Sequence, residues 1–332
     1  GIIDTVSFSS MTSRLYSFRK LFGSNRISGC ALGAALTVLS STAYPTSAWV
    51  LSTSLSNFQA NAQQHRSFSS MKAEASNLSL AQFLCLSDNY GYLVHDPVTG
   101  QTAAVDTPCA KTYNEELNRR GWKLTHILNT HHHWDHTGGN LELKEDGVIV
   151  VGPQNEKEKI PGLDKAVGEG DVFEFAGSEV IVMDAGGHTK GHIAYYFPGQ
   201  SKAFVGDCLF SLGCGKMFEG TPEQFWSSLE KIRALPDETL IYCAHEYTSS
   251  NAKFAMSVEP NNTDLVNRVA IVKAKRARDE PTIPSLLGEE KKANPFLRVD
   301  FSEEIQKNIG VTSSDTAAQA FGKLRKAKDN FR

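Results

Sequence analysis

The stretch Thr130-His131-His132-His133-Trp134-Asp135-His136 is the most informative part of this chain. It follows an apolar run at 124–128 and precedes Gly138-Gly139, so a strand should end here and a helix begin. Alternate residues of an extended segment point the same way, so His131 and His133 can share one ion. Asp135 and His136, past the bend, can face a second ion. Imidazoles and a carboxylate at this density predict a metal site with room for two ions.

Further candidate ligands lie downstream, and each stands at the end of an apolar run. His188 follows the run at 180–183, Asp207 follows 203–205, and His245 follows 240–244. An α/β sandwich gathers a site from the ends of several strands. We therefore expect these three side chains to join the first cluster.

Length and composition set broad limits on the class of protein. The chain has 332 residues, of which 40% are hydrophobic, and this is enough for one large core plus a smaller module. A net charge of -3 gives no general electrostatic reason to bind nucleic acid or an anionic membrane. We expect neither partner for the mature protein, and we expect a monomer.

Residues 1–75 differ in composition from the rest of the chain. Asp4 is the only acidic residue before Met71, while Ser and Thr recur throughout. The basic residues of this part are Arg14, Arg19, Lys20, Arg26 and Arg66. This composition predicts a targeting leader that is no part of the fold.

The destination of the leader stays open between two organelles. Arg66 and the Ser-rich residues before Met71 favour a mitochondrial presequence, which is our first expectation. The alternative is a two-part plastid leader, because the apolar run at 30–39 and the small residues before Trp49 read as a signal peptide. That run is too short for a transmembrane helix. A start at Met71 would give a cytosolic form.

The remainder divides into a catalytic part at 76–247 and a helical part at 248–332. In the first part we expect strands at 80–86, 90–95, 103–106 and 148–151, and helices at 111–120 and 221–234. Thr221 and Pro222 suit the start of the last of these helices. In the second part apolar spacing predicts helices at 249–258, 263–279, 302–308 and 314–328. The pattern indicates an α/β sandwich followed by a small helical domain.

These motifs together resemble the metallo-β-lactamase superfamily. The resemblance rests on T-H-x-H-x-D-H at 130–136, G-H-T-x-G-H at 187–192, Gly206-Asp207 and the late His245. It implies an αββα sandwich with two divalent metal ions. One ion would be held by His131, His133 and His188, the other by Asp135, His136 and His245, with Asp207 bridging them. We expect zinc, with iron or manganese as alternatives, because mixed imidazole and carboxylate ligands suit all three.

From residue 78 to the C-terminus the chain resembles the glyoxalase II, or hydroxyacylglutathione hydrolase, family. The resemblance is carried by residues 214–220, 245–248, 294–298 and 325–329. It implies hydrolysis of S-lactoylglutathione to glutathione and lactate, the second step of methylglyoxal detoxification, by a hydroxide shared between the ions. Asp135 and Asp207 would then be catalytic. The implied substrate contacts are Lys216, Phe218, His245, Tyr247, Arg325 and Lys328.

Some positions differ from the residues that are commonest in the motifs of that family. Other functions also stay open. Phe218 stands where some members have Tyr, and Ala244 stands where many have Gly. A persulfide dioxygenase or another hydrolase of this fold is the main alternative, and a non-catalytic metal-binding protein is a weaker one. Lys216, Tyr247 and the basic C-terminus argue against the dioxygenase, and the full set of ligands argues against a non-catalytic protein. We expect His132, His192, His95 and His126 to be structural.

Overall fold

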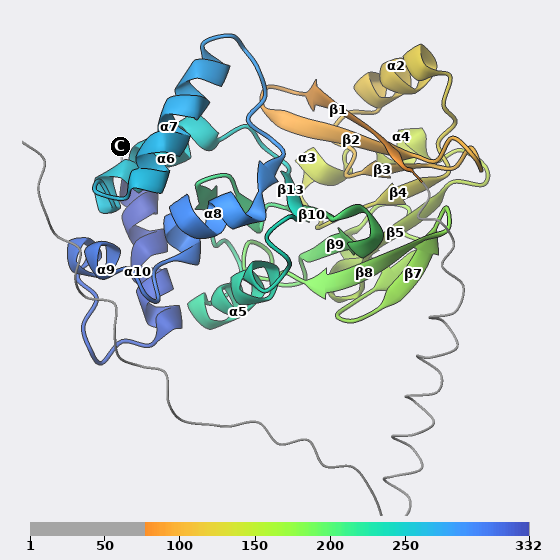
Figure 1. Cartoon of the computed structure of the whole chain (residues 1–332). Helices are drawn as coiled ribbons and strands as arrows, with labels where there is room; N and C mark the ends of the chain where they lie inside the picture. Colours follow the sequence, from red (N-terminus) through yellow and green to blue (C-terminus); the bar gives the residue numbers. More distant parts are fainter. Residues whose placement is uncertain (1–76, 332) are drawn as a thin grey trace, which may run out of the picture. The chain divides into compact units, whose positions relative to one another are not determined.

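The computed structural model describes residues 77–331, in which two six-stranded sheets lie face to face (Figure 1). The leader predicted at 1–75 lies outside the described residues. Strand order in the first sheet follows the sequence, β1-β2-β3-β4-β5-β6. Its strands are β1 (Ser79–Cys85), β2 (Asn89–His95), β3 (Thr102–Val105), β4 (His126–Leu128), β5 (Ile149–Pro153) and β6 (Lys165–Val167). The first three strands pair antiparallel, and the pairs from β3 to β6 are parallel.

The second sheet has the order β14-β13-β10-β9-β8-β7. Its strands are β7 (Val172–Phe175), β8 (Ser178–Asp184), β9 (Ile193–Phe197), β10 (Lys202–Gly206), β13 (Leu240–Cys243) and β14 (Ser285–Leu286). Strands β10 and β13 are parallel, while the other neighbours pair antiparallel. A two-stranded ribbon of β11 (Leu209–Phe210) and β12 (Gly213–Cys214) follows β10.

The core lies between the sheets because side chains alternate across each strand. In the first sheet Val94 and Leu128 point into the cluster shared with the second sheet, where they meet side chains such as Phe204. Their neighbours Leu93 and Ile127 belong to a separate cluster on the outer face. Strands buried on both faces explain the apolar runs that mark β4 and β10 in the sequence.

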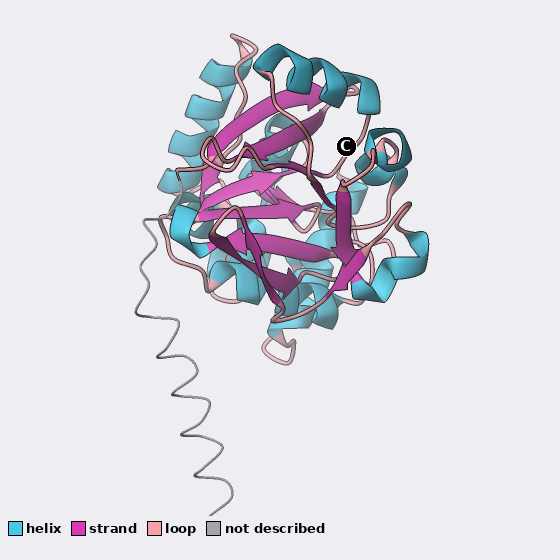
Figure 2. Ribbon diagram, turned by 90° about the vertical axis from the view of Figure 1, so that its right-hand side faces the viewer, coloured by secondary structure: helices cyan, strands magenta, loops and turns pink. Residues whose placement is uncertain are grey.

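Helices cover the outer faces and make the sandwich four-layered, αββα (Figure 2). Helix α2 (Ala110–Arg120) packs Tyr113 and Leu117 on the first sheet. Helix α5 (Pro222–Arg233) shares the main core with the second sheet, and Thr221 caps it by accepting from the Gln224 amide, as the sequence predicts. Short helices α3 (Trp134–Thr137) and α4 (Asn140–Leu143) follow β4, and 3₁₀ turns η1 (Gln154–Lys159) and η2 (Pro198–Gln200) follow β5 and β9.

The C-terminal part is mostly helical, as expected, but it also supplies β14 to the second sheet. It contains α6 (Thr248–Val258), α7 (Thr263–Arg276), α8 (Leu287–Ala293), η3 (Pro295–Leu297), α9 (Glu303–Ile309) and α10 (Ala317–Asn330). Helix α7 ends three residues before the predicted end, and α10 starts later than predicted because a capping box of Thr316 and Gln319 sets its first turn. Phe254, Phe296 and Phe321 join the main core cluster, so these helices pack on the sandwich.

The strands that precede the candidate ligands all end at one edge of the sandwich. Strand β9 is antiparallel to both β8 and β10, so β8 and β10 run in the same direction, and β13 is parallel to β10. The loops after β8, β10 and β13 therefore leave from the same edge, where the loop after β4 also lies. The topology alone brings the four ligand-bearing segments together.

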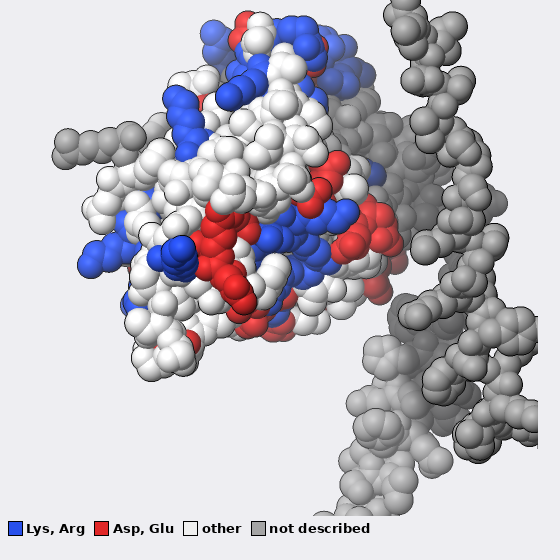
Figure 3. Space-filling view, turned by 60° about the vertical axis from the view of Figure 1, so that its left-hand side comes forward, with Lys and Arg blue, Asp and Glu red and all other residues white. Residues whose placement is uncertain are grey.

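The described surface is mixed in charge. Figure 3 shows Lys and Arg side chains next to Asp and Glu side chains on the face that it presents. Ion pairs of the described residues include Arg298 with Glu259 and Arg233 with Asp300. Among residues 77–331, no helix combines the length and the apolar character needed to cross a membrane.

Candidate metal centre

The first group of ligands consists of three imidazoles from two loops. His131 and His133 follow β4, and His188 follows β8. The Nε2 of His131 lies 3.1 Å from the Nδ1 of His133, and the Nε2 of His188 lies 3.0 Å from the same atom. All three nitrogens are close enough to share one ion. We call this group the first subsite.

The second group combines two imidazoles and a carboxylate. Asp135 and His136 lie in α3, and His245 follows β13. The Oδ2 of Asp135 lies 3.5 Å from the Nε2 of His245 and 3.7 Å from that of His136. We call this group the second subsite.

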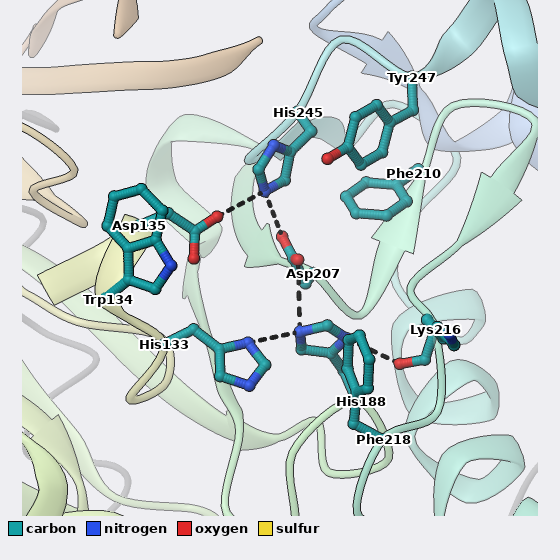
Figure 4. Close-up of a pocket in the computed structure, with 10 residues that line it drawn as sticks. All are labelled: His133, Trp134, Asp135, His188, Asp207, Phe210, Lys216, Phe218, His245 and Tyr247. Carbon is teal, nitrogen blue, oxygen red and sulfur yellow. Dashed lines mark hydrogen bonds and ion pairs between the residues drawn. The ribbon is translucent and has the colours of Figure 1, made fainter. Parts of the chain in front are cut away.

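Asp207, directly after β10, faces both subsites. Its Oδ2 lies 3.4 Å from the Nε2 of His188, and its Oδ1 lies 3.4 Å from the Nε2 of His245 (Figure 4). Gly206 makes this approach possible, because it has φ +48° and a side chain there would collide with Thr130. One carboxylate oxygen is therefore turned toward each subsite.

The chemistry of these groups fits two cations. His136 donates from Nδ1 to Asp106, and His245 donates from Nδ1 to Asp88, each over 2.8 Å. With Nδ1 donating to a carboxylate, each ring has its Nε2 turned inward, where a cation can take the place of a proton. The Nε2 of His136 and the Oδ1 of Asp207 are buried and have no hydrogen-bond partner among the described residues. Buried lone pairs that converge without a proton between them are the arrangement that a divalent ion satisfies.

Each of four ligand histidines has an outer partner that orients its ring. Besides the two carboxylates, the carbonyl oxygen of Lys216 accepts from His188 Nδ1 over 2.7 Å, and the hydroxyl of Thr130 lies 3.1 Å from His131 Nδ1. Such partners fix the tautomer and position of a ligand. The ligand positions are thus set before any ion binds.

Electrostatics differ around the cluster. Burial lowers the pKa of His131, His133 and His188 below the ordinary value. Burial also acts on His136, but nearby carboxylates, Asp207 first, outweigh it and raise its pKa to about 9. For Asp207 burial alone would raise the pKa, yet the surrounding imidazoles, His245 first, hold it below the ordinary value. A carboxylate that stays ionised while buried is suited to lie between two cations.

The histidines expected to be structural lie outside the ligand groups of the two subsites. His132 turns away from the subsites and faces Glu156, with Nδ1 2.8 Å from its Oε2. His192 uses its Nε2 to accept from the backbone N–H of Asp207, and so supports the residue whose carboxylate faces both subsites. His95 stacks on Trp122, and His126 lies beside the hydroxyl of Thr125.

A cavity of about 520 Å³ opens onto the two subsites. The metal side of its wall carries His133, Asp135, His188, Asp207 and His245, and the rest of the lining is Trp134, Phe210, Lys216, Phe218 and Tyr247 (Figure 4). Tyr247 stacks on His245, with ring centroids 4.7 Å apart. Phe218 packs against His133 and His188, at 5.7 and 5.2 Å between centroids. Four of the six predicted substrate contacts therefore line one cavity.

The other two predicted contacts, Arg325 and Lys328, do not line it. Arg325 is 5% exposed, and its guanidinium donates to the carbonyl of Cys214 over 3.0 Å and to Asp329 over 2.7 Å. It lies behind the loop that carries Lys216. The Nζ of Lys328 lies 3.4 Å from the hydroxyl of Ser250. Their contact with substrate stays a prediction.

Sequence reasoning missed the outer partners Asp88, Asp106 and Glu156. Asp106 stands directly after the apolar run of β3, as Asp207 stands after β10. A carboxylate at the end of a buried strand could therefore have indicated Asp106 as well. Asp88 and Asn89 lie between the predicted strands 80–86 and 90–95, where the sequence gives no sign of a contact with a ligand. Glu156 lies in a 3₁₀ turn whose position near the site is not visible in the sequence.

Comparison with known proteins identifies the family. The family model described as metallo-beta-lactamase superfamily matches residues 88–245, and the model described as hydroxyacylglutathione hydrolase C-terminus matches residues 246–331. A hydroxyacylglutathione hydrolase of Hyphomonas neptunium is 50% identical over 255 residues, which cover 76% of this chain and 98% of that protein. One of Erythrobacter litoralis is 51% identical over 76% of this chain and 100% of its own length. The chain belongs to the hydroxyacylglutathione hydrolase family. This membership makes the cluster a binuclear divalent metal site.

Solved structures agree on the fold. ETHE1 from Myxococcus xanthus aligns with a TM-score of 0.53 and 25% identity, over 74% of this chain and 98% of that one. The BLEG-1 B3 metallo-beta-lactamase aligns with a TM-score of 0.52 and 18% identity, over 66% of this chain and 99% of that one. The predicted fold, a metallo-β-lactamase sandwich with C-terminal helices, is confirmed.

Proposed function

We propose that this chain hydrolyses the thioester of S-(2-hydroxyacyl)glutathione, with S-lactoylglutathione as the first substrate, to glutathione and a 2-hydroxy acid. The observation that carries the proposal is a single cavity that joins two metal subsites to Lys216 and Tyr247. The two metal subsites suit attack on a carbonyl group. Lys216 and Tyr247 suit recognition of a peptide with free carboxylates. The relatives named hydroxyacylglutathione hydrolase support the same reaction.

Two divalent ions, when bound at these ligands, would lower the pKa of water toward neutrality and polarise the thioester carbonyl. The chain itself holds the ligand set rigid through the outer partners of its histidines. Within the described residues, no serine, threonine or cysteine lines the cavity. The carboxylates and imidazoles of the lining belong to the metal subsites, so we assign the nucleophile to water, and a thiolate leaves readily enough to need no dedicated general acid.

The glutathione moiety would lie along Lys216 and Tyr247. Lys216 is exposed, and its Nζ lies 5.2 Å from the ring centre of Phe218. An ammonium group forms charge-assisted hydrogen bonds with the carboxylates of glutathione. Tyr247 is fixed against His245, so its phenol stays at a constant place relative to the second subsite. Trp134 and Phe210 supply apolar surface that narrows the access of bulk water.

The test uses the full chain reconstituted with zinc and supplied with S-lactoylglutathione. We expect release of glutathione and lactate. Lys216→Ala should raise KM about 10-fold, since a hydrogen bond to a charged group contributes roughly 1.5–3 kcal/mol. Hydrolysis of a small thioester without glutathione should hardly change.

Lys190→Ala, at an exposed lysine near the site but outside the cavity lining, is the matched control and should keep the original KM. Absence of thioesterase activity, together with oxygen uptake on glutathione persulfide, would instead identify a dioxygenase.

We propose zinc as the resident metal. Imidazole and carboxylate ligands at these positions also suit iron and manganese, so the ligand set alone does not choose. Elemental analysis of the chain purified without added metal tests this. A majority of iron or manganese over zinc would contradict the proposal.

We propose that residues 1–75 direct the enzyme into an organelle, first the mitochondrial matrix. The acid-poor, basic and Ser-rich composition supports this. A fluorescent fusion of residues 11–75 should colocalise with mitochondria, while plastid signal would favour the two-part leader and diffuse signal would reject import. We also propose a monomer, which light scattering of the purified chain tests.

A further inference from the structure

The end of the turn between β1 and β2 and the start of β2 place three consecutive side chains against the second subsite and the residue that follows its His245. Asp88 Oδ1 accepts from His245 Nδ1 over 2.8 Å. Asn89, which is buried, donates from Nδ2 to the backbone oxygen of Asp135 over 3.1 Å and to its Oδ2 over 3.3 Å. The Tyr90 hydroxyl donates to the carboxylate of Glu246, the residue after His245.

The backbone of the same turn is joined to the segment that carries His245. Asn89 and His245 form an isolated antiparallel bridge. The amide of Tyr90 donates to the carbonyl of Ala244 over 2.7 Å, and the amide of Glu246 donates to that of Asp88 over 3.0 Å. These bonds tie the start of β2, in the first sheet, to the loop after β13, in the second. Two of the three ligands of the second subsite, His245 and Asp135, are therefore held by one turn.

The first subsite has no corresponding connection to this turn. Of the hydrogen bonds that the described residues of the turn make, none reaches His131, His133 or His188. Of these ligands, His131 is oriented by Thr130 and His188 by the Lys216 carbonyl. The turn thus acts on one of the two ions.

We propose that Asp88-Asn89-Tyr90 is a clamp that selectively sets the affinity of the second subsite, with Asp88 and Asn89 as positioning residues. Asp88 keeps the proton of His245 on Nδ1 and so leaves Nε2 free to bind the ion. Asn89 holds the Asp135 carboxylate in the rotamer that turns Oδ2 toward His245, 3.5 Å away. The clamp rests on the two-ion centre and does not depend on which thioester is the substrate.

The test counts ions in the full chain loaded with zinc and titrated with a zinc chelator. In Asn89→Ala and Asp88→Asn, one ion per chain should be removed at a chelator concentration roughly 10- to 100-fold lower than in the original chain. This is the usual loss of metal affinity when an outer partner of a ligand is removed. The other ion should leave as before. Histidine resonances in NMR spectra should show His245 and His136 freed while His131, His133 and His188 stay bound.

Asp96→Asn is the matched control for damage to the hairpin. Asp96 is a buried acidic residue in the turn at the other end of β2, where it accepts from the amides of Val98 and Thr99. The Asp96→Asn variant should release both ions at the same chelator concentrations as the original chain. Thermal unfolding of the metal-free forms should show that all three variants are folded. Unchanged release of both ions in Asn89→Ala and Asp88→Asn would overturn the clamp, and so would simultaneous loss of both. The test measures metal content and not activity. The clamp can therefore be confirmed or rejected even if the chain shows no thioesterase activity.

Discussion

The two metal subsites lie side by side but are stabilised by different kinds of partner. In the first, the outer partners of His131 and His188 are a hydroxyl and a backbone carbonyl, both neutral. In the second, those of His136 and His245 are the carboxylates of Asp106 and Asp88. The two subsites thus share the carboxylate of Asp207 but have outer partners of different charge.

The pKa shifts of the buried imidazoles differ in direction between the two subsites. At the first, burial lowers the pKa of the imidazoles, so they are neutral and ready to bind at physiological pH. At the second, carboxylates around His136 outweigh burial and raise its pKa to about 9. More negative charge therefore surrounds the second ion, and that charge comes from segments far apart in the sequence.

Removing the shared ligand should have the largest effect. Asp207→Ala leaves two cations facing each other without the carboxylate between them, so both ions should be lost. Turnover should fall by more than the roughly 100-fold that the loss of an outer partner can cost. Elemental analysis and the thioester assay check this. Two ions per chain in the variant would show that Asp207 does not bridge the subsites.

Loss of an outer carboxylate should affect mainly the second subsite. Asp106→Asn weakens the bond to His136, and we expect about 10- to 100-fold weaker binding of the second ion. Asp106 also accepts from the amide and hydroxyl of Thr130, so the first ion should weaken to a smaller degree. Stepwise chelator titration measures both. Equal weakening of the two ions would contradict the charge difference between the subsites.

The opposite selectivity is expected for Glu156, which connects the two loops of the first subsite. Its carboxylate accepts from the His132 amide over 3.0 Å and from the Gly191 amide over 2.8 Å. Glu156→Gln keeps the shape but weakens these bonds, so the first ion should bind up to about 10-fold less tightly, the lower end for an outer partner. Glu219→Gln, at the more exposed carboxylate beside His132, is the control and should change neither ion. A Glu156 variant that lost the second ion first would reverse the assignment.

The smallest effect should come from Lys328, which lies outside the cavity lining. Lys328→Ala should raise KM for S-lactoylglutathione by roughly 3- to 10-fold with kcat and metal content unchanged, because a half-buried lysine at the margin of the site should contribute less than the roughly 1.5–3 kcal/mol of a well-formed hydrogen bond to a charged group. Steady-state kinetics of both variants measures this. Lys326→Ala, at an exposed lysine on the same helix, is the control and should keep the original KM. An unchanged KM would make Lys328 a helix surface residue only.

Much of the fold was predictable because its signals are local. The apolar runs of β4, β10 and β13 mark buried strands, and Thr221 and Pro222 mark the start of α5. Helix α8 was missed because its seven residues, with Glu289 and Glu290 beside Lys291, show too short an apolar pattern. Its Glu290 is buried and accepts from the Leu212 amide, a contact between residues 78 positions apart.

The sequence by itself determined which imidazoles and carboxylates gather at the candidate metal centre, because such side chains at the ends of strands have few other uses. It also indicated the sandwich and, through family resemblance, the reaction. Only the tertiary structure decided which outer groups hold each ligand, because Asp88 and His245, or Asp106 and His136, meet only after the strands pair. It likewise decided that Arg325 lies buried behind the cavity while Lys216 reaches into it, since burial depends on what packs around a side chain rather than on its type.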